Sequence, residues 1–229
     1  MIPLRDINPT RRRPLVTWAL MAILTAVWAY QALSGEDLIG AWGMIPAELT
    51  EVGGAAAYLR IVTSMFIHAG WWHLLGNVWF LHVFGDNVED ELGRGPFLAF
   101  YLASGLAAAA THVAIAPEAP LPLVGASGAI AGVLGAYLVL HPRARVVALV
   151  IVFFAELPAW IFLFVWFGLQ LAFAFSSLGT ESTGGGVAFF AHVGGFVTGV
   201  LMMLALRRSK AEDERQPDDR IEPLGPAPR

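Results

Sequence analysis

Four polar side chains lie within apolar stretches of this sequence and together could catalyse acyl transfer: Ser127, His192, His73 and Asn77. A serine hydroxyl becomes an effective nucleophile when a base within hydrogen-bond reach takes its proton. Ser127 lies at the head of an apolar run, in the stretch GASGAIAG, and His192 is the candidate base. No acidic residue lies near His192 in its own apolar run, so the sequence predicts a Ser–His dyad without an orienting carboxylate. Because His192 must be neutral to accept a proton, we expect the rate to fall as the pH drops through its pKa.

Acyl transfer also requires hydrogen-bond donors directed at the oxyanion that develops on the substrate. The backbone N–H of Ser127 is available because it lies in the first turn of an expected helix, where amides lack helical partners. His73 and Asn77 are four residues apart, so they share a helix face and could add side-chain donors. We therefore expect an oxyanion hole formed by His73, Asn77 and the amide of Ser127.

Each of these residues also has a structural interpretation. A serine at a glycine-rich helix start is often a packing residue or a cap, and an isolated histidine or asparagine in a membrane often bonds a neighbouring helix. A zinc site is the rival use of the histidines. The sequence lacks His-Glu-x-x-His, however, and no acidic residue lies near His68 or His73. We therefore expect no metal site and no cofactor, and the combination of polar residues favours catalysis.

The composition predicts that these residues are held by membrane-spanning helices. Of the 229 residues, 57% are hydrophobic and 14% are charged, against about 25% charged in soluble domains. Apolar runs near 20 residues recur, which is the length needed to span a bilayer. We expect an all-α bundle of six spans at about 15–33, 71–84, 97–115, 127–140, 157–175 and 187–206. Residues 146–155 are apolar but too few to span, so we interpret them as an interfacial or re-entrant piece. The absence of cysteine excludes disulfides and thiolate catalysis.

The distribution of Lys and Arg predicts how the spans are oriented. With the N-terminus in the cytoplasm, thirteen of the 14 basic residues lie inside and only Arg60 lies outside. The second, fourth and sixth spans then run inward and place the four polar residues near the outer end. A channel would instead need polar residues along a path across the whole bilayer, so a channel function is less favoured. We expect a cytoplasmic basic segment at 1–13, a six-helix catalytic domain at 14–207 and a disordered, charged cytoplasmic tail at 208–229.

Spacing of glycines predicts which spans meet. Gly128 and Gly132 are four residues apart, as are Gly195 and Gly199. Such small-residue faces let membrane helices approach closely. Since His192 is three residues before Gly195 and shares its face, we expect the sixth span to pack on the fourth and to place His192 over Ser127. The fourth span covers only about 20 Å of a hydrocarbon core ~30 Å thick, so Ser127 is expected about 10 Å below the outer surface.

The motifs GASGAIAG around Ser127, AHVGGFVTG around His192 and MFIHAGWWHLLGN ending at Asn77 resemble those of the rhomboid family of intramembrane serine proteases. The resemblance covers about residues 13–207. It implies that Ser127 is the nucleophile, that His192 is the base, and that Gly125 belongs to the loop forming the oxyanion hole. It further implies that residues 34–65 form a first loop lying partly in the outer leaflet, with Arg60 and Glu89 in structural roles.

The same resemblance implies transmembrane protein substrates, contact with membrane lipids and no nucleic-acid partner. The expected location is a bacterial inner membrane, with both termini cytoplasmic. Two departures stand out. The Trp-Arg pair of the family is Leu59-Arg60 here, and Ala131 replaces an aromatic residue that in some members stacks on the catalytic histidine. Because Ala131 leaves the ring of His192 without that support, a non-catalytic binder of client membrane helices is the alternative function.

Overall fold

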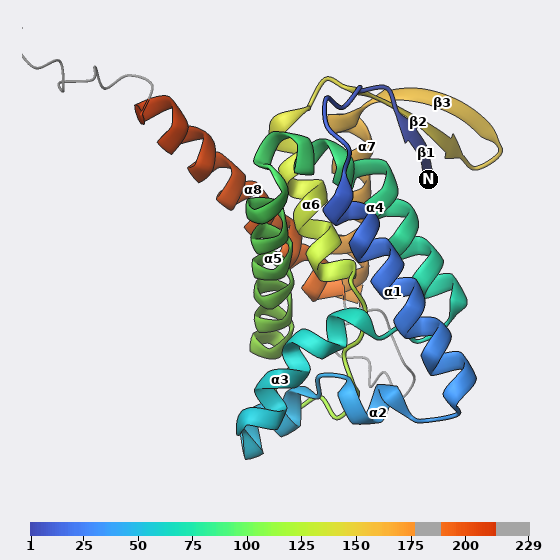
Figure 1. Cartoon of the computed structure of the whole chain (residues 1–229), viewed down its shortest axis with the longest axis vertical. Helices are drawn as coiled ribbons and strands as arrows, with labels where there is room; N and C mark the ends of the chain where they lie inside the picture. The colour runs from blue at the N-terminus through green and yellow to red at the C-terminus, as the bar shows by residue number, and fades with distance from the viewer. Residues whose placement is uncertain (177–188, 214–229) are drawn as a thin grey trace, which may run out of the picture.

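The computed structural model describes residues 1–176 and 189–213, and six long helices dominate it (Figure 1). They are α1 (Leu15–Ser34), α4 (Trp71–Leu92), α5 (Arg94–Ile115), α6 (Ser127–Leu140), α7 (Ala159–Ser176) and α8 (Phe189–Asp213). These helices correspond to the six predicted spans. The first two residues of the sixth predicted span, 187 and 188, lie outside the described residues. The fold is therefore the predicted helical bundle of a membrane protein.

Four of these helices, α1, α5, α7 and α8, are long and apolar enough to cross a membrane. Helix α6 is shorter, at 14 residues, and every residue from Gly128 to Tyr137 is buried. A helix that is apolar on all sides belongs in the centre of a bundle. By contrast, α7 exposes Phe164, Leu169 and Phe173, which is the pattern of a helix facing lipid.

Helices α5, α6 and α8 pack closely on one another because glycines allow the three backbones to approach. A Cβ on Gly195 or Gly199 of α8 would collide with the carbonyl oxygens of Gly128 and Gly132, respectively. On α6, a Cβ on Gly128 would first meet Ala108 of α5, and a Cβ on Gly132 would first meet Ser104 of α5. The sixth span thus packs on the fourth as expected, and the same α6 glycines also admit α5.

The segment between α1 and α4 contains four short helices at the end of the bundle opposite the sheet (Figure 1). They are α2 (Leu38–Trp42), the π-helix η1 (Glu48–Val52), α3 (Ala55–Thr63) and the 3₁₀ helix η2 (Ser64–Phe66). This first loop contacts the connection that leads into α6. The backbones of Met44 and Leu123 bond each other, and the N–H of Gly125 donates to the carbonyl of Ser64 over 2.9 Å.

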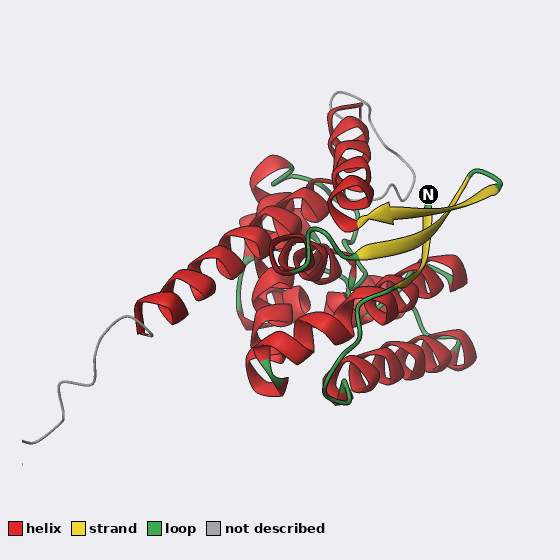
Figure 2. Ribbon diagram, turned by 90° about the horizontal axis from the view of Figure 1, so that it is seen from above, coloured by secondary structure: helices red, strands yellow, loops and turns green. Residues whose placement is uncertain are grey.

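A three-stranded antiparallel sheet lies at the other end, to one side of the helices (Figure 2), and the sequence did not predict it. Strands β1 (Ile2–Asp6), β2 (Arg145–Val150) and β3 (Phe153–Pro158) pair in that order and lie at the side of the bundle (Figure 2). The stretch 146–155, expected as an interfacial or re-entrant piece, is a β-hairpin. The valine-rich sequence suits strands. Its pairing with residues 2–6 is a contact over more than 130 positions that no local pattern reveals.

The structure also corrects the boundary of the charged tail. We placed the end of the folded part at Arg207, whereas α8 continues to Asp213. Its last turns project away from the other helices (Figure 1). Arg207 still contacts the bundle, because its guanidinium donates to the carbonyl of Val139 over 2.8 Å. The rest of the predicted tail, residues 214–229, lies outside the described residues.

Candidate active site

Ser127 is the first residue of α6, and the loop before it has an unusual backbone. Gly125 has a φ of 117°, a conformation that residues with a side chain rarely adopt. The bond from its N–H to Ser64 holds the loop against η2. Because Ser127 opens the helix, its own N–H has no acceptor within α6 and is free to bond a substrate oxygen.

His192 lies in the first turns of α8 and its ring contacts Ser127. The distance from His192 Nε2 to Ser127 Oγ is 2.7 Å. On the other side of the ring, Nδ1 lies 2.8 Å from Oε1 of Gln170, a residue of α7. Since a carboxamide oxygen can only accept, this contact favours the tautomer in which Nδ1 carries the hydrogen and donates it to Gln170. The lone pair is then on Nε2, facing the serine hydroxyl, as a general base requires.

Aromatic side chains of α7 and α8 surround the His192 ring. The ring of Trp166 lies 6.2 Å from it at an interplanar angle of 33°, and Phe189 meets it edge-on at 6.2 Å. Ala131 is fully buried on α6. The ring support that we could not find at Ala131 therefore comes from α7 and α8.

His73 and Asn77 of α4 lie against the loop that leads to Ser127. A Cβ on Gly125 would be 2.6 Å from His73 Nε2 and 3.7 Å from Asn77 Nδ2. The N–H of Ala69 donates to His73 Nδ1 over 3.4 Å, so the ring hydrogen is on Nε2, on the side of Gly125. Asn77 Nδ2 donates one hydrogen to the carbonyl of His73 over 3.0 Å and retains a second. Both side chains thus have a donor at the loop.

His68, which is not one of the predicted site residues, packs directly on His73. The two rings are 5.2 Å apart and nearly perpendicular, and His68 is fully buried. Gln31 of α1 bonds its backbone in both directions, donating to the carbonyl over 2.8 Å and accepting from the N–H over 3.4 Å. His68 therefore connects α1 to the side chain of His73.

The two charged residues that the family resemblance marked as structural lie away from Ser127. Arg60 of α3 forms an ion pair with Glu48 of η1 inside the first loop. Glu89, near the end of α4, accepts from the N–H groups of Val16 and Thr17 over 3.0 and 2.8 Å, and from the Thr17 hydroxyl over 2.8 Å. A carboxylate at a helix N-terminus satisfies free amides and complements the helix dipole. Glu89 therefore caps α1.

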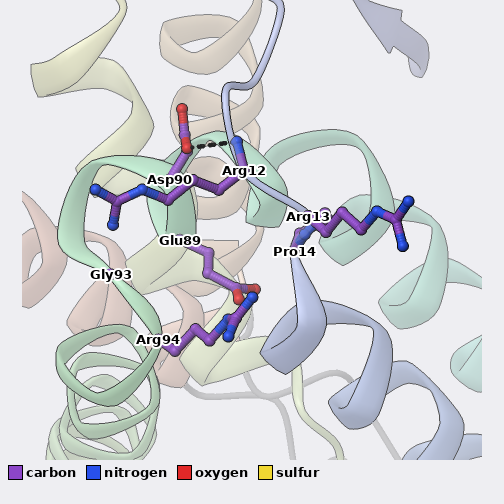
Figure 3. A pocket seen from close by; sticks show the side chains of 7 residues that line it. All are labelled: Arg12, Arg13, Pro14, Glu89, Asp90, Gly93 and Arg94. Carbon is purple, nitrogen blue, oxygen red and sulfur yellow. Dashed lines mark hydrogen bonds between the residues drawn. The ribbon is translucent and has the colours of Figure 1, made fainter.

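A pocket of about 290 Å³ lies beside this cap, at the turn between α4 and α5 (Figure 3). It is lined by Arg12, Arg13, Pro14, Glu89, Asp90, Gly93 and Arg94. Asp90 accepts from the backbone N–H groups of Arg11 and Arg12, each over 3.0 Å. The lining carboxylates are thus occupied in fastening the N-terminal segment. Neither Ser127 nor His192 lines this pocket, so it is separate from the candidate active site.

Sequence reasoning missed Gln170 and Trp166. Both lie in the predicted fifth span, and a glutamine among apolar residues of a membrane helix is itself a signal of function or of a bond to another helix. From the sequence we expected a Ser–His dyad in which no carboxylate orients His192. The structure instead brings a neutral amide from a different helix.

The family model of the Rhomboid domain matches residues 55–209, a range that includes all the site residues described around Ser127. The protein of Saccharomyces cerevisiae named Rhomboid protein 1, mitochondrial, is 32% identical over 147 residues, covering 62% of this chain and 40% of the yeast protein. Rhomboid protease GluP of Bacillus subtilis is 32% identical over 203 residues, covering 87% of this chain and 36% of its own length.

A second Bacillus subtilis protein, Putative rhomboid protease YdcA, is 30% identical over 130 residues. That match covers 56% of this chain and 63% of the relative. In each of these three matches, the aligned part is less than two thirds of the relative's own length.

Proposed function

The chain belongs to the rhomboid family, and from that membership we propose that it is an intramembrane serine endopeptidase that cleaves transmembrane segments of other proteins. Ser127 is the nucleophile and His192 the general base. The observation that carries the proposal is the 2.7 Å separation of His192 Nε2 from Ser127 Oγ, with the Gln170 oxygen 2.8 Å from the other ring nitrogen. Two of the relatives are named proteases, which supports the same activity.

The reaction follows from these positions. His192 Nε2 takes the proton of the Ser127 hydroxyl while Oγ attacks the scissile carbonyl carbon. The oxyanion that forms accepts hydrogen bonds from the Ser127 N–H, from His73 Nε2–H and from the free N–H of Asn77. His192 then returns the proton to the leaving amine, and the peptide bond breaks to give an acyl-enzyme. Water attacks this ester with His192 again as the base, which releases the second product and restores Ser127.

The proposed location and partners follow from composition and exposure. Thirteen of 14 Lys and Arg residues lie inside when the termini are cytoplasmic, so we propose that the sheet end faces the cytoplasm of a bacterial inner membrane. The first loop then lies partly in the outer leaflet. The exposed apolar side chains of α7 contact lipid, and transmembrane proteins are the substrates. No cofactor or metal takes part in the proposed reaction.

The alternative function, a non-catalytic binder of client helices, was proposed because Ala131 provides no aromatic ring to hold the His192 side chain. Gln170, Trp166 and Phe189 contact that ring, so the reason for preferring a binder is removed. The protease proposal therefore stands as the better supported of the two.

The test is cleavage of a single-span substrate by the purified protein in lipid vesicles, together with labelling by a fluorophosphonate. Wild type should cleave and be labelled, and Ser127→Ala should do neither. Ser104→Ala is the matched control, because Ser104 is a buried serine on α5 whose hydroxyl has no hydrogen-bond partner in the described part of the chain. Cleavage that persists in Ser127→Ala would overturn the proposal and favour the binder.

A further inference from the structure

Gln170 is a polar residue in the middle of an otherwise apolar helix. Helix α7 reads AWIFLFVWFGLQLAFAFS, and Gln170 is half-buried while Leu169 beside it is exposed. An amide among lipid-facing residues is costly unless it is bonded. The Gln170 oxygen is bonded, and its partner is Nδ1 of His192 at 2.8 Å.

We propose that Gln170 is a positioning residue for His192, in the place where serine proteases of other folds use a carboxylate. The proposal rests on the proposed function, since it assigns Gln170 a role in the same reaction. A neutral imidazole carries one hydrogen, and only the form with the hydrogen on Nδ1 leaves Nε2 able to accept the Ser127 proton. By accepting from Nδ1–H, the Gln170 oxygen selects that form and fixes the direction of the ring.

The same helix supplies the second restraint on the ring. Trp166 lies one helical turn before Gln170, so the two side chains share a face of α7. Gln170 bonds the edge of the imidazole, and the Trp166 ring lies tilted next to it, with the ring centroids 6.2 Å apart. Helix α7 therefore does what an aromatic residue at position 131 would do from α6, and it adds the choice of tautomer.

A neutral partner has a measurable consequence for pH dependence. During the reaction His192 becomes an imidazolium, and a carboxylate would stabilise that cation more strongly than a carboxamide does. In Gln170→Glu the acceptor is retained and a negative charge is added next to the ring. The acid limb of the kcat profile should therefore move to higher pH in Gln170→Glu, while activity at alkaline pH is kept.

The experiment measures kcat and KM for a single-span substrate in vesicles across pH 4–9, with wild type, Gln170→Leu and Gln170→Glu. Gln170→Leu should lower kcat by about 10- to 100-fold with little change in KM, because the ring loses its orientation. Gln170→Glu should recover most of kcat above neutral pH. Ser176→Ala is the control, because among the described residues this α7 hydroxyl bonds the carbonyl of Phe173 within its own helix.

The outcomes separate this inference from the proposed function. If Ser127→Ala still cleaves, the proposed function fails. If cleavage depends on Ser127 but Gln170→Leu keeps the wild-type kcat, or Gln170→Glu is as impaired as Gln170→Leu with no shift in its profile, only the role of Gln170 fails. Should Gln170→Leu not fold, nitrogen NMR of wild-type His192 near pH 8 decides. A hydrogen on Nδ1 supports the inference, and a hydrogen on Nε2 overturns it.

Discussion

At the scale of single residues, the site depends on where each neutral histidine holds its one hydrogen. His192 has its hydrogen on Nδ1 because Gln170 accepts it, which leaves Nε2 free as a base. His73 has its hydrogen on Nε2 because Nδ1 accepts from Ala69, which leaves a donor beside the Ser127 loop. In the proposed reaction the two histidines therefore have opposite tasks, since His192 accepts a proton and His73 donates a hydrogen bond.

Gly125 should be intolerant of any side chain because of its position against His73. In Gly125→Ala the new Cβ would lie 2.6 Å from His73 Nε2, at a backbone φ of 117° that alanine disfavours. The displaced ring would no longer face the oxyanion, so we expect kcat to fall about 100-fold, the lower end of the effect of losing one such donor. Cleavage kinetics and fluorophosphonate labelling measure this loss.

Gly76→Ala is the control for that prediction. Gly76 lies between His73 and Asn77 in the sequence, and a Cβ there would meet no atom within 4 Å. This variant should keep wild-type kinetics. A Gly125→Ala protein with the same kcat as Gly76→Ala would show that the position of His73 does not matter for the reaction.

At the scale of elements, the packing of three helices determines the positions of the site residues. Helix α6 carries Ser127, α8 carries His192, and α7 supplies the groups that hold the His192 ring. The glycines of α8 lie directly against carbonyl oxygens of α6, so backbone contact fixes the separation of these two helices. A small increase in that separation would lengthen the bond between Ser127 and His192.

Gly199→Ala tests this dependence without touching the site. A Cβ on Gly199 would collide with the carbonyl of Gly132, two turns from His192. Overpacking of this kind costs about 1–3 kcal/mol. We expect a lower thermal midpoint in detergent and a lower kcat at temperatures where the protein is still folded.

Gly168→Ala on α7 is the matched control, because a Cβ there meets no atom within 4 Å. Alanine also favours a helix over glycine by up to about 1 kcal/mol, so this variant should be neutral or slightly stabilised. Equal midpoints for the two variants would contradict the role of close α6–α8 contact.

At the scale of the whole molecule, the N-terminal segment ties the sheet to the centre of the bundle. The indole N–H of Trp79 on α4 donates to the carbonyl of Pro3, and the Tyr137 hydroxyl of α6 donates to the Asp6 carboxylate over 2.7 Å. Burial raises the pKa of Asp6 above its ordinary value of 3.8, and the bond from Tyr137 opposes that rise. The strand is thus anchored to the same helix that carries Ser127.

Tyr137→Phe should therefore destabilise the protein by about 1–2 kcal/mol, because it leaves the half-buried Asp6 carboxylate without this donor. The loss should be largest at pH values above the raised Asp6 pKa, where the carboxylate is ionised, and should shrink as the pH falls below that pKa, since a neutral carboxyl needs the donor less. Thermal midpoints in detergent at pH 7 and pH 4 measure both effects.

Tyr101→Phe is the control, because the Tyr101 hydroxyl is buried and has no hydrogen-bond partner within residues 1–176 and 189–213. Removing that hydroxyl should be neutral or stabilising. A midpoint for Tyr137→Phe that matches Tyr101→Phe at both pH values would show that the bond to Asp6 contributes nothing.

Local sequence determined the six helices, and it also determined which residues could do chemistry. Apolar runs predicted all six helices, and four of these helices are long and apolar enough to cross a membrane. This was possible because the hydrophobic requirement of a bilayer acts on each segment separately. Glycine spacing predicted that α8 packs on α6, since close approach depends on small residues at one face. The sequence alone therefore predicted that Ser127 and His192 lie together.

Only the tertiary structure decided which groups surround that pair. Gln170 and Trp166 reach His192 from α7, and residues 2–6 pair with a hairpin more than 130 positions away. Such contacts depend on the rotation of one helix relative to another and on strand pairing between distant segments, and neither leaves a periodic signal within a segment. Periodicity and composition predict the secondary structure and the buried face of each segment, whereas only the folded structure determines which distant residues contact that face.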